Sequence, residues 1–155
     1  MSIEASVFGA LTGAVAGGLI SYFVSSKVAK KQAKTQYNYQ IQRTRHDWYT
    51  QANTLAELTE HDWYDVMNQS EVDQETQPAD RFIPRIEELR NHAARGKSLD
   101  VNGDVVDGLE QLAADLSAAL TVMGSGDDLW MIEHEMHPVI DQVREKATQR
   151  ATELE

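Results

Sequence analysis

The run from Ser25 to Asn68 contains neither proline nor glycine, and this constrains the fold more than any other feature of the sequence. Those two residue types most often end or kink a helix, so their absence predicts one long helix. Within the run, Ile41, Trp48 and Leu55 repeat one heptad position. A heptad repeat of apolar residues is typical of helices that pack against helices, so we expect a helical hairpin or a short coiled coil.

An uncharged apolar segment at residues 5–24 precedes this run. A helix of about 20 residues is long enough to cross the hydrocarbon of a bilayer, so we predict a single transmembrane helix. Lysines follow the segment and none precedes it, which is the reverse of a signal peptide. The positive-inside rule then predicts a single-pass protein of the cell membrane, with its N-terminus outside and its C-terminal domain cytoplasmic. The lysines expected to set this topology are Lys27, Lys30, Lys31 and Lys34.

Three glycines lie four residues apart within the apolar segment, at Gly9, Gly13 and Gly17. On a helix this spacing places them along one face. The pattern resembles the glycine-zipper segments through which transmembrane helices approach closely and self-associate. The sequence therefore predicts a homo-oligomer that forms through this face, with the lipid membrane as a second partner.

Charge is divided unevenly along the chain. Residues 1–50 carry six basic and two acidic residues, whereas residues 51–155 carry eight basic and 23 acidic residues. So negative a domain repels the phosphates of nucleic acids, so no nucleic-acid partner is expected. Abundant acidic residues with few lysines are also typical of halophilic proteins, in which salt screens the repulsion. The chain has no cysteine, which excludes disulfides and thiolate metal sites.

Three further helices are expected after a polar loop at residues 70–77. Asp80 would cap a helix over 81–95 that ends at Gly96. A second helix over 105–123 would begin after Asp104, and a third would run from residue 127 or 128 to about 154, kinked or broken at Pro138. Their expected core positions are Phe82, Ile83, Ile86, Leu89 and Ala93; Val105, Leu109, Leu112, Leu116, Leu120 and Met123; and Leu129, Ile132, Met136, Val139 or Ile140, Val143 and Ala147.

The predicted fold class is thus all-α, with an N-terminal transmembrane helix that continues into a small cytoplasmic bundle of about four helices. The expected domains are a transmembrane anchor at 1–26, a basic juxtamembrane helix at 27–40 and an acidic helical bundle at 41–155. A tetrapeptide, His-Asp-Trp-Tyr, occurs at 46–49 and again at 61–64. Fifteen residues turn a helix to within about 60° of its starting direction, so both copies should face roughly one side. The aromatic residues expected to anchor the packing are Trp48, Trp63 and Trp130.

Three motifs invite a metal-site interpretation, and each lacks a required part. The two His-Asp pairs resemble metal phosphohydrolases of the His-Asp type, with His46, His61, Asp62 and either Asp104 or Asp107 as ligands. That family builds a larger domain and spaces its first histidine further away. Residues 100–104 resemble a calcium loop, but its sixth and twelfth positions are valine and glutamine. Residues 133–137 place two histidines three residues apart, whereas the zinc protease motif needs four. No metal, cofactor or catalytic residue is expected.

The layout resembles that of small anchored proteins of prokaryotes and their viruses, especially those of halophilic archaea. It indicates a membrane-anchored interaction or scaffold protein, not an enzyme, that presents its bundle to a cytoplasmic protein partner. One alternative is a structural component of a membrane-containing viral or envelope assembly. A weaker alternative is the metal-dependent hydrolase of the His-Asp type.

Overall fold

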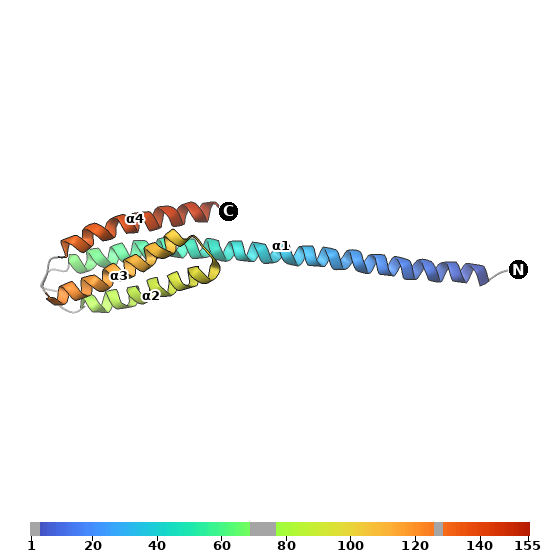
Figure 1. Ribbon diagram of the computed structural model, residues 1–155, viewed down its shortest axis with the longest axis horizontal. Helices are drawn as coiled ribbons and strands as arrows, with labels where there is room; N and C mark the ends of the chain where they lie inside the picture. The colour runs from blue at the N-terminus through green and yellow to red at the C-terminus, as the bar shows by residue number, and fades with distance from the viewer. Residues whose placement is uncertain (1–3, 69–76, 126–128) are drawn as a thin grey trace. The chain divides into compact units, whose positions relative to one another are not determined.

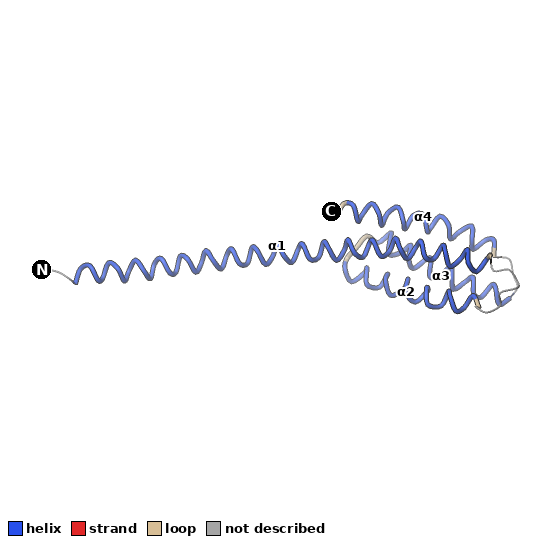
Figure 2. Tube along the Cα trace, turned by 180° about the vertical axis from the view of Figure 1, so that it is seen from behind, coloured by secondary structure: helices blue, strands red, loops and turns tan. Residues whose placement is uncertain are grey.

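In the computed structural model the described residues are 4–68, 77–125 and 129–155, and side chains are described for 28–68, 77–124 and 129–155. These ranges form four helices and contain no strand (Figures 1 and 2). The helices are α1 (Glu4–Met67), α2 (Pro78–Leu99), α3 (Gly103–Ser125) and α4 (Trp130–Thr152). The prediction of an all-α chain with about four helices is confirmed.

The chain divides into two compact units, Met1–Ile41 and Gln42–Glu155. The first unit holds the N-terminal part of α1, and its described side chains from residue 28 to residue 40 are all exposed. The second unit holds the rest of α1 together with α2, α3 and α4. α1 crosses the boundary as one helix, because the run without proline or glycine contains nothing that would end it.

In the second unit, each helix runs antiparallel to the helix before it (Figures 1 and 2). Antiparallel neighbours joined by short connections are the usual topology of a four-helix bundle. The link from α2 to α3 takes only residues 100–102. It begins with Asp100 in a left-handed conformation (φ 51°), whose backbone N–H satisfies a carbonyl at the end of α2.

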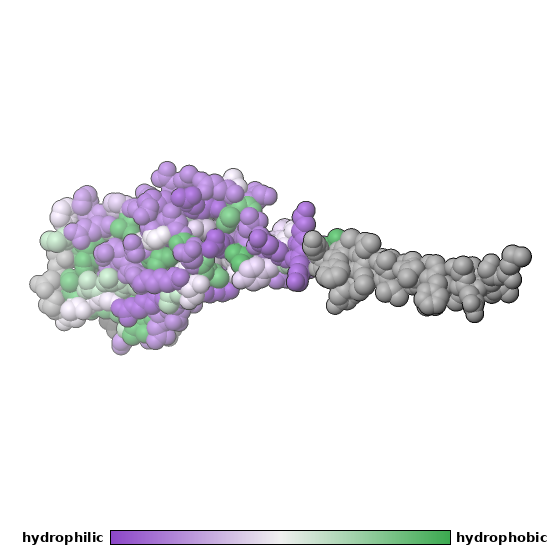
Figure 3. Space-filling model, turned by 45° about the vertical axis from the view of Figure 1, so that its right-hand side comes forward, coloured by the Kyte–Doolittle hydropathy of each residue, from purple (hydrophilic) through white to green (hydrophobic). Residues whose placement is uncertain are grey.

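The core of the bundle is one cluster to which every helix contributes an apolar stripe. On α3 the predicted stripe is buried over its first four positions and becomes partly exposed at the last two. The main buried residues are Trp48, Ala52, Ala56 and Trp63; Phe82, Ile86, Leu89 and Ala93; Val105, Leu109, Leu112 and Leu116; and Met136, Ile140, Val143 and Ala147. Hydrophilic residues cover most of the visible surface of this unit, with apolar residues scattered among them (Figure 3).

Helix boundaries differ from the prediction in several places. α2 begins at Pro78, and Asp80 supports this start from inside the helix, where its carboxylate accepts a hydrogen bond from the Gln77 N–H at 3.2 Å. Asp104 does not cap α3; the Asn102 Oδ1 does, accepting the Asp104 N–H at 2.8 Å. α4 begins at Trp130 and continues through Pro138 without a break.

Gly96 was expected to end α2, but it lies inside the helix and allows close packing against α1. A Cβ atom added at Gly96 would overlap the Trp48 ring at Cζ2 and would lie 2.8 Å from Cε2. No side chain fits there without displacing the indole. The glycine therefore sets the distance between α1 and α2 rather than the length of α2.

The expected transmembrane helix is not supported. In the part of the chain that the structure describes, no helix combines the length and the mean hydropathy that crossing a bilayer requires. From residue 28 onward the described side chains of α1 are mostly polar or charged, and eight of the 20 residues at 5–24 are glycine or alanine, which add little transfer free energy. The predicted localisation, single-pass with the N-terminus outside and the bundle in the cytoplasm, is corrected accordingly.

Candidate functional site

A pair of reciprocal hydrogen bonds joins α1 to α2 at the first His-Asp-Trp-Tyr copy. Trp48 Nε1 donates to the His92 carbonyl oxygen at 2.9 Å, and His92 Nε2 lies 2.9 Å from the Trp48 carbonyl oxygen. The two rings stack with their centroids 4.7 Å apart and their planes 7° apart. Both side chains are buried. The contact therefore fixes the histidine ring in position and orientation.

The hydrogen bond also fixes the protonation of His92. A carbonyl oxygen can only accept, so Nε2 carries the proton and Nδ1 is left as an acceptor in the neutral ring. Burial lowers the pKa of His92, the hydrogen bond to Trp48 opposes that effect, and the charge of Arg95 lowers the pKa further. His92 is therefore uncharged at neutral pH.

An open groove of about 480 Å³ lies between α1 and α2 beside this histidine. Its acidic residue, Glu88, pairs with Arg85 at 2.5 Å, and Arg85 also binds Asp62. Arg95 forms no ion pair with any residue that the structure describes, so its guanidinium lines the groove without a carboxylate partner. The lining residues are Thr50, Gln51, Thr54, Leu55, Glu88, Asn91, His92 and Arg95.

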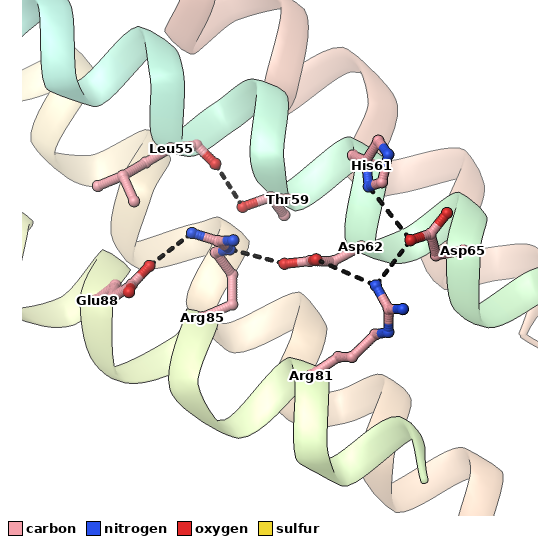
Figure 4. A network of polar contacts seen from close by, with 8 residues as sticks. All are labelled: Leu55, Thr59, His61, Asp62, Asp65, Arg81, Arg85 and Glu88. Carbon is pink, nitrogen blue, oxygen red and sulfur yellow. Dashed lines mark hydrogen bonds and ion pairs between the residues drawn. The ribbon is translucent and has the colours of Figure 1, made fainter. Parts of the chain in front are cut away.

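A network of ion pairs joins α1 and α2 at the second copy of the tetrapeptide (Figure 4). Arg85 Nε donates to Asp62 Oδ2 at 2.8 Å, and Arg81 Nη1 donates to Asp65 Oδ2 at 2.7 Å. The side chains of Arg85 and Asp62 are only 13% and 14% exposed. His61 lies at the edge of the network, with its Nδ1 3.3 Å from Asp65 Oδ2. Both carboxylates of α1 bind arginines of α2, so we interpret the network as a structural contact between the two helices.

The residues nominated for a His-Asp metal site are not brought together. Asp62 is held by Arg85, and Asp104 pairs with Lys146 at 2.7 Å, which lowers the pKa of Asp104 through the hydrogen bond and the charge of the lysine. His46 and His61 contact neighbouring carboxylates of α1, Asp47 and Asp65. Within the described ranges, no group of three or more histidine or acidic side chains could hold a metal ion.

The other two metal-like motifs serve the helix ends and the bundle surface. In the calcium-like loop, Asp100 adopts the left-handed conformation after α2 and Asn102 caps α3. In the zinc-like motif, the two histidines diverge. His134 stacks on Trp130, whereas His137 contacts the Tyr64 ring and lies 3.8 Å from a Glu133 carboxylate oxygen.

The structure separates the three tryptophans expected to anchor the packing. Trp48 and Trp63 are buried in the core, but Trp130 is 64% exposed and stacks on His134 at the start of α4. Trp130 is therefore not a core anchor. Its position in the first turn of α4, beside a loop, lies outside the stripe formed by Met136, Ile140 and Val143.

The residues of the predicted oligomerisation face, Gly9, Gly13 and Gly17, belong to α1, but their surroundings lie outside the described side chains, as does the side chain of Lys27. The other topology-setting lysines, Lys30, Lys31 and Lys34, are exposed.

The sequence interpretation missed His92 and Arg95, the two residues that define the groove. His92 lies three residues after Leu89 on the buried stripe of α2, and this position is a signal that could have been used. A histidine among apolar core positions must find hydrogen-bond partners inside the fold, so its position predicts a polar contact with a neighbouring helix.

No family model, curated protein or solved structure matches the chain. What the protein does has to be inferred from its own residues.

Proposed function

We propose that the protein is a self-associating helical scaffold without catalytic activity. Copies pair along the N-terminal part of α1 and thereby hold their acidic bundles next to one another. The observation that carries the proposal is the exposure of α1 from residue 28 to residue 40, where every side chain faces solvent.

A helix of this kind needs a partner to remain folded. An isolated helix is marginally stable in water, and most helical stability in proteins comes from packing of an apolar face. Large apolar side chains in this part of α1 remain uncovered: Val28, Tyr37 and Tyr39 are 48%, 62% and 65% exposed. A second copy would cover them and would stabilise the helix at the same time.

The segment of α1 before residue 28 also favours a second copy of the chain as the partner. Residues 5–24 carry no charge, and extended apolar surface is seldom left exposed to water. Gly9, Gly13 and Gly17 lie at four-residue spacing, so a second helix could approach the backbone closely along the groove that they leave. These three glycines remain the predicted contact face.

Charge predicts how the association responds to salt. Pairing in parallel brings Lys30, Lys31 and Lys34 of one copy near the same lysines of its partner. The Debye length falls from about 10 Å at 0.1 M salt to about 3 Å at 1 M, so added salt should strengthen self-association. Added salt would instead weaken the binding of these lysines to an acidic partner. The salt dependence therefore distinguishes a second copy of the chain from an acidic partner.

The absence of catalysis is part of the proposal. The side chains of Asp62 and Arg85, only 14% and 13% exposed, are bound to each other, and His92 is held by a backbone carbonyl. Groups in such contacts contribute to packing, and none of them is paired with a nucleophile in the manner of an enzyme site.

Disulfide crosslinking of single-cysteine variants of the full chain tests the proposal, because the chain has no cysteine of its own. The variants are Gly9→Cys, Gly13→Cys and Gly17→Cys, with Val7→Cys, Leu11→Cys and Val15→Cys as matched positions on other faces. We expect dimers to form preferentially at the glycine positions and more completely at 1 M than at 0.1 M salt. Equal crosslinking at all six positions would exclude the glycine face. A monomer in sedimentation at every salt concentration would overturn the proposed function.

A further inference from the structure

We propose that the groove between α1 and α2 binds a small organic monocarboxylate, with the anionic group on Arg95 and the apolar part along Leu55. The inference is independent of self-association, because all the lining residues belong to the unit Gln42–Glu155. The groove volume of about 480 Å³ falls within the range typical of small-molecule sites.

The positive charge of Arg95 favours a ligand with a single negative charge. The bundle is strongly acidic and would repel most anions, but in this groove Glu88 is bound by Arg85, which it shares with Asp62, while Arg95 has no acidic partner among the described residues. His92 is neutral and adds no charge. A single positive charge matches one carboxylate, and the planar guanidinium of arginine can donate two parallel hydrogen bonds to it. A phosphate dianion would leave one negative charge unpaired.

The threonine hydroxyl groups on the α1 side of the groove are already used in hydrogen bonds, and this determines which way the ligand lies. Thr50 Oγ1 donates to the His46 carbonyl oxygen at 3.1 Å, and Thr54 Oγ1 donates to the Thr50 carbonyl oxygen at 3.1 Å. Both hydroxyl protons are therefore used within α1. The carboxylate of the ligand therefore binds Arg95 on α2 rather than these hydroxyls. The apolar part of the ligand contacts the partly buried Leu55.

The wall beside Arg95 is preformed. His92 lines the groove, and its ring is held by the stack on Trp48 and by the hydrogen bond to the Trp48 carbonyl oxygen. A rigid wall reduces the entropy lost when a ligand binds. It also provides a reporter, because a ligand in the groove changes the surroundings of the His92 ring, which the stack and the hydrogen bond hold in place.

Benzoate and its uncharged analogue benzamide test the proposal on the full chain. The His92 ring resonances are followed by NMR during titration of each compound into the wild type, Arg95→Gln and Arg90→Gln. Arg90 is the matched control, because it is exposed on the same helix but does not line the groove. We expect saturable binding of benzoate with a Kd of about 1 mM or below, at least about tenfold weaker binding to Arg95→Gln, and unchanged binding to Arg90→Gln.

A second variant, Thr54→Trp, fills the groove from an exposed position of α1 and should abolish binding while the helical circular dichroism stays unchanged. Benzamide should bind at least about tenfold more weakly than benzoate, because it cannot form the ion pair. Equal affinity of the two compounds, equal binding by wild type and Arg95→Gln, or no saturable change at His92 up to about 10 mM benzoate would each overturn the proposal.

Discussion

The two copies of His-Asp-Trp-Tyr on α1 have the same sequence and different environments. Both tryptophans are buried, but Trp48 Nε1 donates to the His92 carbonyl oxygen, whereas Trp63 Nε1 has no hydrogen-bond partner in the described part of the chain. Trp48 stacks on His92 and Trp63 on Phe82. The local sequence thus determines that a tryptophan enters the core, and the facing helix determines its contacts.

The two aspartates also differ, but here the residue of the second copy is the more buried one. Asp47, in the first copy, is largely exposed, and its carboxylate lies 3.5 Å from His46 Nδ1. Asp62, in the second copy, is nearly buried and binds Arg85. The 15-residue spacing rotates the second copy by about 60° from the first, and this rotation is enough to move the aspartate from solvent to the boundary with α2.

The tyrosines complete the comparison. Tyr49 is buried, and its hydroxyl oxygen accepts the Asn102 N–H at 2.8 Å, which ties α1 to the link between α2 and α3. Tyr64 is 45% exposed, and its ring lies 5.6 Å from the His137 ring, centroid to centroid. The first copy is therefore held by hydrogen bonds to the backbone and the second by ion pairs between side chains.

The largest effect should come from Gly96→Ala, which tests the close packing of α2 against Trp48 in the first copy. The added methyl group would overlap the Trp48 ring and lie 3.0 Å from Val106 Cγ2. Displacing a buried indole should reduce the free energy of unfolding by about 3 kcal/mol, measured by urea denaturation of the full chain. The control is Gly103→Ala, which has no atom within 4 Å of its added Cβ and should change stability by less than about 0.5 kcal/mol. Equal effects would refute the close packing.

The second prediction tests the ion pairs of the second copy. Asp62→Ala leaves the poorly exposed Arg85 without that carboxylate and should cost about 2 kcal/mol. This is less than the roughly 3–5 kcal/mol of a fully buried pair, because water still reaches both side chains. Asp47→Ala, the matched change in the first copy, should cost less than about 0.5 kcal/mol. Comparable losses in urea denaturation would mean that burial of the aspartate does not distinguish the copies.

The third prediction compares the tryptophans. Trp48→Phe removes the 2.9 Å hydrogen bond to the His92 carbonyl oxygen and should cost about 2 kcal/mol, through the lost hydrogen bond and the lost volume. Trp63→Phe removes an N–H group that has no partner in the described residues, so it should cost about 1 kcal/mol, from volume alone. A larger loss at Trp63 than at Trp48 in thermal or urea unfolding would reverse the comparison.

Much of the fold could be predicted from the sequence, because the signals were local. The proline-free and glycine-free run predicted the unbroken part of α1 from residue 25 to its C-terminal end, and the stripe at Val105, Leu109, Leu112 and Leu116 predicted the buried face of α3. Gly96 was misread for the same reason. As a local signal, a glycine near a helix end indicates a cap, whereas its actual role depends on Trp48, which is distant in sequence.

The candidate site was beyond prediction because it exists only where two helices meet. Nothing near His92 in the sequence specifies that its ring stacks on Trp48, and nothing near Arg85 specifies that it also binds Asp62 of α1. The charge pattern of a helix gives the sign of its surface. The charge left over in a groove depends on how the pairs form across it.

The smallest effect is a pH dependence confined to the first copy. Burial lowers the pKa of His92 in the folded chain below its ordinary value of 6.5, so below pH 6.5 the unfolded chain binds a proton that the folded chain does not. The free energy of unfolding should therefore fall as the pH decreases from 7.5 to 5.5. His92→Gln, whose amide can still donate to the Trp48 carbonyl oxygen, should reduce this slope. His61→Gln, at the exposed histidine of the second copy, is the matched control. Equal slopes in all three proteins would mean that the stacked histidine takes up its proton as readily as one in water, and the distinction between the copies would then rest on Gly96, Trp48 and Asp62 alone.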